Sequence, residues 1–236
     1  MPTHWDALYL AAAFLVPLAL QHWVTMPRLR ANTAAGIPHA RLGTYRRTIV
    51  LQWTIVLPIA AAWIATGRPW SALWLTWPND SWRPYVAAGI LVGAIAFGAV
   101  QFRGIGRIAA RAEHRARYRG KLAGAAIIAP RDATELRWFI ALSLTAGVCE
   151  EILCRGYLMW ALFACLNVPL AVIAGAVIFG VEHVYQGVRG VVKTGVVGLM
   201  MIGVVWLTGS LIPAMVIHAM FNVTTGVLAY VAYSSE

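Results

Sequence analysis

The chain has 236 residues, of which 60% are hydrophobic and 12% are charged. Soluble domains contain about 45–50% apolar and about 25% charged residues, so the composition excludes a single soluble globule. Because a bilayer-spanning helix needs about 20 apolar residues, we expect an all-α, polytopic membrane helix bundle with about seven transmembrane helices. The net charge of +10 would suggest nucleic acid in a soluble protein. Here the basic residues lie mostly between hydrophobic segments, so we expect no nucleic-acid partner.

Hydropathy predicts seven helical spans, three before residue 138 and four after it. They are Trp5–Thr25, Thr48–Ala65, Tyr85–Phe102, Trp138–Phe163, Pro169–Tyr185, Val191–Leu207 and Leu211–Tyr233. The first span lacks the basic start and the cleavage site of a secretory signal, so we expect it to be retained.

The distribution of basic residues predicts the orientation, because Lys and Arg near span ends favour the cytoplasmic side. Of the 19 basic residues, most follow the first, third or fifth span: Arg28, Arg30, Arg41, Arg46, Arg47, Arg103, Arg107, Arg111, Arg115, Arg117, Arg119, Lys121, Arg131, Arg137, Arg189 and Lys193. We therefore expect an integral membrane protein with its amino terminus outside and its carboxyl terminus in the cytoplasm. The short loops are typical of a prokaryotic inner (plasma) membrane.

The basic loop after the third span carries an arginine at every fourth position. These residues are Arg103, Arg107, Arg111, Arg115 and Arg119. On one helix this spacing would form a cationic stripe. We expect the segment 103–121 to attract anionic lipids, at roughly 1 kcal/mol per basic residue near the membrane surface.

The fourth predicted span contains three charged residues, Glu150, Glu151 and Arg155. Each costs at least about 2.5–3.5 kcal/mol at the middle of a span, so each needs a partner. Glu151 and Arg155 are four residues apart in the order that favours an ion pair. Glu150 projects about 100° away from Glu151 and has no partner on its own helix. An unpaired intramembrane carboxylate is a candidate functional residue.

Polar residues on two later spans are candidate partners for Glu150. The fifth span contains Phe179 and His183, and the seventh contains His218 and Asn222. The members of each pair are four residues apart and share a helix face. A single membrane histidine more often makes an interhelical hydrogen bond than it catalyses a reaction. The combination of these groups on three otherwise apolar spans favours a common site.

Three spaced patterns together resemble the motifs of a known family. They are Glu-Glu-x-x-x-Arg at Glu150–Arg155, Phe-x-x-x-His at Phe179–His183 and His-x-x-x-Asn at His218–Asn222. In this order they resemble the CPBP family of intramembrane proteases, also called the CAAX protease and bacteriocin-processing, or ABI, family. Its best-known members are the Ras-converting CAAX endopeptidases. The resemblance implies that 138–236 is a four-span catalytic core of CPBP type, preceded by an N-terminal three-span region, 1–137, with a basic cytoplasmic loop.

The resemblance also implies an activity, that of an intramembrane endopeptidase, a hydrolase of the glutamic peptidase type. Glu150 and His183 would activate water, and His218 and Asn222 would stabilise the oxyanion of the tetrahedral intermediate. The residues that would shape the site are Glu151, Arg155 and Phe179. The expected partner is a membrane-associated protein or peptide substrate.

The residues leave alternatives open for the mechanism and the function. We expect no cofactor, but Glu150, His183 and His218 could hold Zn²⁺ with water as the fourth ligand. Intramembrane Glu and His also mark ion pathways, so a membrane transporter or proton-relay protein is an alternative, although the sequence shows no strong internal repeat. Another alternative is a non-catalytic membrane scaffold or immunity protein of the same fold. Glu182 we interpret as extending towards the cytoplasmic edge near Arg189.

Overall fold

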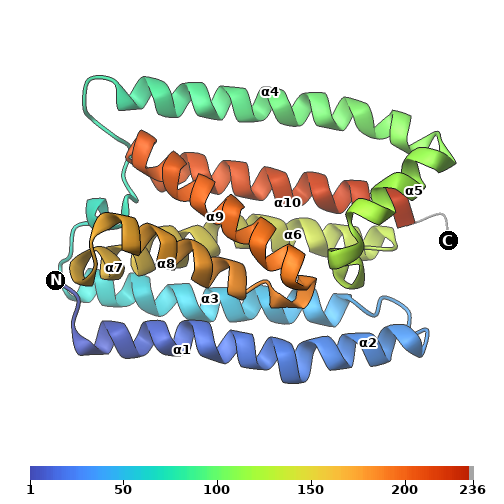
Figure 1. Ribbon diagram of the computed structural model, residues 1–236, viewed down its shortest axis with the longest axis horizontal. Coiled ribbons are helices and arrows are strands. Elements are labelled where there is room, and N and C mark those ends of the chain that lie inside the picture. Colours follow the sequence, from blue (N-terminus) through green and yellow to red (C-terminus); the bar gives the residue numbers. More distant parts are fainter. Residues whose placement is uncertain (234–236) are drawn as a thin grey trace.

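The structure, a computed structural model, describes residues 1–233 and contains helices but no strand in that range. The long helices run side by side along the molecule (Figure 1). In chain order the helices are α1 (His4–Leu20), η1 (Gln21–Thr25), α2 (Met26–Ala34), α3 (Leu42–Ala65), η2 (Trp70–Leu73), α4 (Arg83–Ala109), α5 (Ala112–Lys121), η3 (Ala123–Ile128), α6 (Ala133–Glu150), η4 (Glu151–Leu158), α7 (Met159–Cys165), α8 (Val168–Val181), η5 (Val184–Gln186), α9 (Val188–Thr208) and α10 (Leu211–Tyr233). The predicted all-α class is confirmed.

Five helical segments are long and apolar enough to cross a bilayer. They are His4–Ala34, Leu42–Ala65, Arg83–Ala109, Val188–Thr208 and Leu211–Tyr233, and they contain five of the seven predicted spans. The segment α6–η4–α7 carries five charged residues, Glu135, Arg137, Glu150, Glu151 and Arg155, and α8 has only 14 residues. The other two predicted spans therefore fall outside this group. These segments make the protein an integral membrane protein.

The fifth predicted span, Pro169–Tyr185, is too long, because α8 ends at Val181 and His183 lies in the turn that follows. At 1.5 Å per residue α8 is about 21 Å long, which is shorter than the hydrocarbon core of about 30 Å. The rings of Phe179 and His218 are 6.2 Å apart. The end of α8 therefore lies beside α10 within the bundle.

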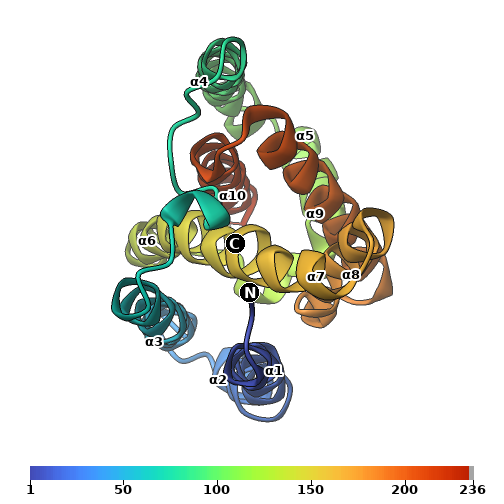
Figure 2. The same ribbon diagram turned by 90° about the vertical axis from the view of Figure 1, so that its left-hand side faces the viewer.

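The helices α6, η4 and α7 form the central rod of the bundle, with α3, α10 and α8 arranged around it (Figure 2). A Cβ atom added at Gly147 of α6 would lie 2.7 Å from the Cβ of Ala219 on α10. Small residues at such crossings allow helix backbones to approach closely in a membrane. This close approach brings the end of α6, with Glu150, next to His218.

The cationic stripe predicted for 103–121 does not lie on one helix. The helix α4 ends at Ala109 and α5 begins at Ala112, while Arg111 between them is extended, with φ −124° and ψ 120°. Figure 1 shows α5 turning away from the axis of α4. The stripe prediction is therefore wrong, because the arginines are divided between two helices of different direction. The attraction of this segment for anionic lipids stays a prediction.

Candidate active site

Three charged residues of the central rod, Glu150, Glu151 and Arg155, lie at or within its π-helical segment. Glu150 is the last residue of α6, and Glu151 begins the π-helical segment η4. Short π-helical insertions are rare and often occur at functional sites. Arg155 Nη1 donates a hydrogen bond of 2.9 Å to Glu151 Oε1, and both side chains are buried. The ion pair predicted from their spacing is present.

The ring of Phe179 contacts three polar groups of the site. The guanidinium carbon of Arg155 lies 3.9 Å from the ring centroid. The imidazole of His183 lies 4.9 Å away, centroid to centroid, and that of His218 lies 6.2 Å away. Phe179 thus joins α8 to both η4 and α10, and its site-shaping role stays a prediction.

His218 bridges the two glutamates. Its Nδ1 lies 2.7 Å from Glu151 Oε1, and because a carboxylate only accepts, Nδ1–H is the donor. This bond directs Nε2 towards Glu150, whose Oε2 is 3.8 Å away. That distance is longer than a hydrogen bond, so the second contact is electrostatic.

The carboxylate of Glu150 has one engaged oxygen and one free oxygen. Its Oε1 accepts a hydrogen bond of 2.8 Å from Nε2 of Gln52 on α3. Its Oε2 is buried and has no hydrogen-bond partner among residues 1–233. The side chain of Glu150 is 22% exposed, whereas that of Glu151 is fully buried. Glu150 is therefore the more accessible of the two carboxylates.

Gln52 was missed by the sequence reasoning. The available signal was an amide within the apolar run of the second predicted span. That signal is weak, because a lone glutamine does not indicate which helix it faces.

His183 and Asn222 lie at the margin of this network. His183 Nδ1 donates 2.9 Å to the carbonyl oxygen of Phe179, which leaves Nε2 as its available nitrogen. Asn222 lies one turn beyond His218 on α10, is half-buried, and makes no hydrogen bond within the described part of the chain. The structure thus brings Glu150 and His218 together. His183 is linked to His218 only by the ring of Phe179, which contacts both imidazoles. Asn222 contacts none of these groups through a hydrogen bond in the described residues.

The residues considered as zinc ligands do not form a ligand set. Within residues 1–233, no three His, Cys, Asp or Glu side chains are placed to hold a metal ion. Glu150 and His218 face each other, but His183 is anchored to the backbone of its own helix end. The arrangement is a network of carboxylates and imidazoles.

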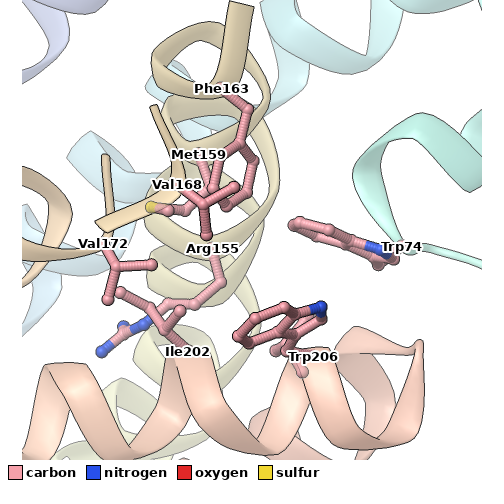
Figure 3. Close-up of a pocket in the computed structure, with 9 residues that line it drawn as sticks. Trp74, Arg155, Met159, Phe163, Val168, Val172, Ile202 and Trp206 are labelled. Carbon is pink, nitrogen blue, oxygen red and sulfur yellow. The ribbon is translucent and has the colours of Figure 1, made fainter. Parts of the chain in front are cut away.

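Two cavities lie near these residues. The larger, of about 210 Å³, lies between Met159, Val172, Trp74 and Trp206, with Arg155 at its edge (Figure 3). Its lining is otherwise apolar, and the guanidinium points away from the two tryptophans (Figure 3).

The smaller cavity, of about 30 Å³, lies directly beside Gln52 and Glu150. A water molecule needs roughly 10–15 Å³ of such space. The smaller cavity is large enough for one water molecule, but the surface that lines it is apolar and Glu150 Oε2 is buried, so it offers such a water no polar partner. The larger cavity lies beside Arg155.

The fold and the site define a class, an integral membrane helix bundle with a buried cluster of carboxylates and imidazoles between its helices. Residues 132–224 match the family described as Rce1-like, type II CAAX prenyl endopeptidase. The match spans less than half of the chain and contains all three motifs, so it confirms the resemblance of this segment to the CPBP, or CAAX protease, family. The family implies a protease with a membrane-associated peptide substrate. No curated protein and no solved structure matches the chain.

Proposed function

We propose that the protein is an intramembrane endopeptidase in which Glu150, with His183, activates water to attack a peptide bond. The observation that carries this proposal is the free Oε2 of Glu150, which is buried, lacks a hydrogen-bond donor among residues 1–233 and lies 3.8 Å from His218. A carboxylate oxygen with no protein donor can take a proton from water.

We propose that His218 and Asn222 stabilise the oxyanion. The Nδ1–H of His218 is engaged by Glu151, so its free nitrogen, Nε2, would supply the donor when protonated. The amide of Asn222 makes no hydrogen bond within the described residues, which leaves it available to a substrate. Removing one oxyanion donor typically costs about 10²–10³ in rate, so we expect Asn222→Leu to lower kcat by that factor.

The direct test replaces Glu150 by glutamine in the full-length protein in proteoliposomes, with a membrane-anchored CAAX-type peptide as substrate. Loss of a general base costs about 10²–10⁴ in rate, so cleavage by Glu150→Gln should fall by that range at an unchanged unfolding temperature. Glu113→Gln is the matched control, because this exposed carboxylate lies on α5, away from the site. Activity close to wild type in Glu150→Gln, or equal loss in both variants, would refute the assignment.

We propose that no metal ion takes part. In support, Nδ1 of His218 is hydrogen-bonded to Glu151 and Nδ1 of His183 to the carbonyl oxygen of Phe179, and no three His, Cys, Asp or Glu side chains among residues 1–233 are placed as a ligand set. A tight chelator should then leave cleavage unchanged. Inactivation by the chelator, with about one equivalent of Zn²⁺ in the purified protein, would contradict this. Ion flux in the same proteoliposomes without cleavage would favour the transporter alternative.

We propose that all seven predicted spans belong to the membrane domain, with the amino terminus outside, the carboxyl terminus in the cytoplasm and a prokaryotic inner membrane as the location. In support, Figure 1 shows α2 and α5, which carry many of the basic residues, at the same end of the bundle. A reporter fused within 103–137 should report the cytoplasm, and an external signal would contradict the orientation.

A further inference from the structure

We propose that Gln52, which lies outside the segment that matches the family, is a positioning residue that holds the carboxylate of Glu150 in its reactive orientation. The inference rests on the proposed function, because it assigns Gln52 a role in the same reaction. It also makes α3, a helix of the N-terminal half, part of the proposed active site.

The contact joins two polar groups inside an apolar environment. Gln52 lies within the 24-residue helix α3, and its Nε2 donates to Glu150 Oε1 at 2.8 Å. This distance is typical of a hydrogen bond to an ionised oxygen. Ile55, Val56 and Leu153 line the same small cavity, so little else there can donate to the carboxylate. Burying the Gln52 amide N–H without a hydrogen bond in such surroundings would cost free energy. The bond to Glu150 therefore stabilises this orientation of the side chain.

The bond fixes the plane of the Glu150 carboxylate. Because the final torsion of a glutamate is broad, an unheld carboxylate can rotate to an orientation in which neither of its two equivalent oxygens faces His218. With Oε1 held by Gln52, Oε2 is the oxygen 3.8 Å from His218 Nε2.

The neighbouring glutamate is held in the same manner. Glu151 Oε1 is bound by Arg155 and His218, and its Oε2 is buried without a hydrogen-bond partner in residues 1–233. Each glutamate therefore has one fixed and one unengaged oxygen. The partners differ, since Glu151 has a cation and Glu150 has a neutral amide. A neutral donor orients Glu150 without neutralising it, which leaves its negative charge for proton abstraction.

A structural role predicts a different result from a positioning role. If the bond merely joined α3 to α6, its loss would lower the unfolding temperature and leave the chemistry unchanged. If Gln52 orients Glu150, its loss will lower kcat, because proton abstraction follows substrate binding. The KM will stay the same, since Gln52 touches no substrate.

The test replaces Gln52 by methionine in the full-length protein in proteoliposomes. Methionine keeps an unbranched side chain but cannot donate. Because a misplacement of about 1 Å can cost about 10²-fold in rate, we expect kcat to fall by about 10- to 100-fold at unchanged KM in a protein that still folds. If Gln52→Met does not fold, Gln52→Asn carries the test, because its amide is one methylene too short. Gln21→Met is the matched control, since Gln21 lies on η1 and has no contact with Glu150.

The inference is overturned by a wild-type kcat in the Gln52 variant, by an effect confined to KM, or by an equal fall in Gln21→Met. Failure of the proposed function would appear separately, as equal cleavage by the wild type and Glu150→Gln. In that case the inference about Gln52 falls with it.

Discussion

Replacing Arg155 by methionine should strongly destabilise the protein, because it leaves Glu151 charged and buried. Both side chains of this pair are almost fully buried, and removing one partner of such a pair costs about 3–5 kcal/mol. His218 keeps its hydrogen bond to Glu151, which offsets part of the loss. The guanidinium also loses its contact with the Phe179 ring, worth up to about 2 kcal/mol when desolvated. We therefore expect a net loss of about 3–5 kcal/mol.

The measurement is the free energy of unfolding of the purified protein in detergent. The double variant Glu151→Gln/Arg155→Met should recover much of the loss, because it removes the orphaned charge. The exposed pair between Arg83 and Asp80, at 3.2 Å, provides the matched control. There Asp80→Asn should cost no more than about 1 kcal/mol. An Arg155→Met protein no less stable than Asp80→Asn would refute the argument from burial.

Two further predictions concern helix packing and the start of α6. Gly147→Val should destabilise by about 1–3 kcal/mol through overpacking against Ala219, and a wild-type unfolding temperature would contradict the close approach of α6 and α10. Burial raises the pKa of Asp132. Hydrogen bonds from the backbone N–H of Glu135 and from His39 lower it by a larger amount, so the pKa lies below the ordinary value. Its stabilisation should therefore be complete above about pH 4 and disappear as the pH falls through the lowered value. Asp132→Asn should accordingly differ from the wild type in unfolding free energy at neutral pH and converge with it in acid; a constant difference would contradict the shift.

Features that depend on neighbouring residues could be predicted from the sequence. The bond between Glu151 and Arg155 joins residues one helical turn apart, and the long apolar runs predicted five segments that suit a bilayer. Both follow from local geometry and hydropathy.

The features that escaped prediction depend on distant parts of the chain or on small changes of backbone. Val184 and Tyr185 continue the apolar run, so hydropathy could not show that α8 ends at Val181. The π-helical widening that begins at Glu151 leaves the spacing pattern unchanged. The bond from Gln52 to Glu150 spans 98 positions and exists only because α3 packs beside α6.

Contacts between the two halves of the chain explain why the family motifs alone do not describe the site. The division between 1–137 and 138–236 stays a prediction, but α1 and α3 both hold the central rod near the catalytic candidates. Tyr157 of η4 donates 2.7 Å to Asp6 of α1, which also receives two hydrogen bonds from Arg68. Gln52 holds Glu150 at the other end of the same stretch. Both ends of this stretch are therefore anchored by the first half of the chain, so the proposed catalytic groups lie in the matched segment while hydrogen bonds from preceding helices hold the rod that carries them.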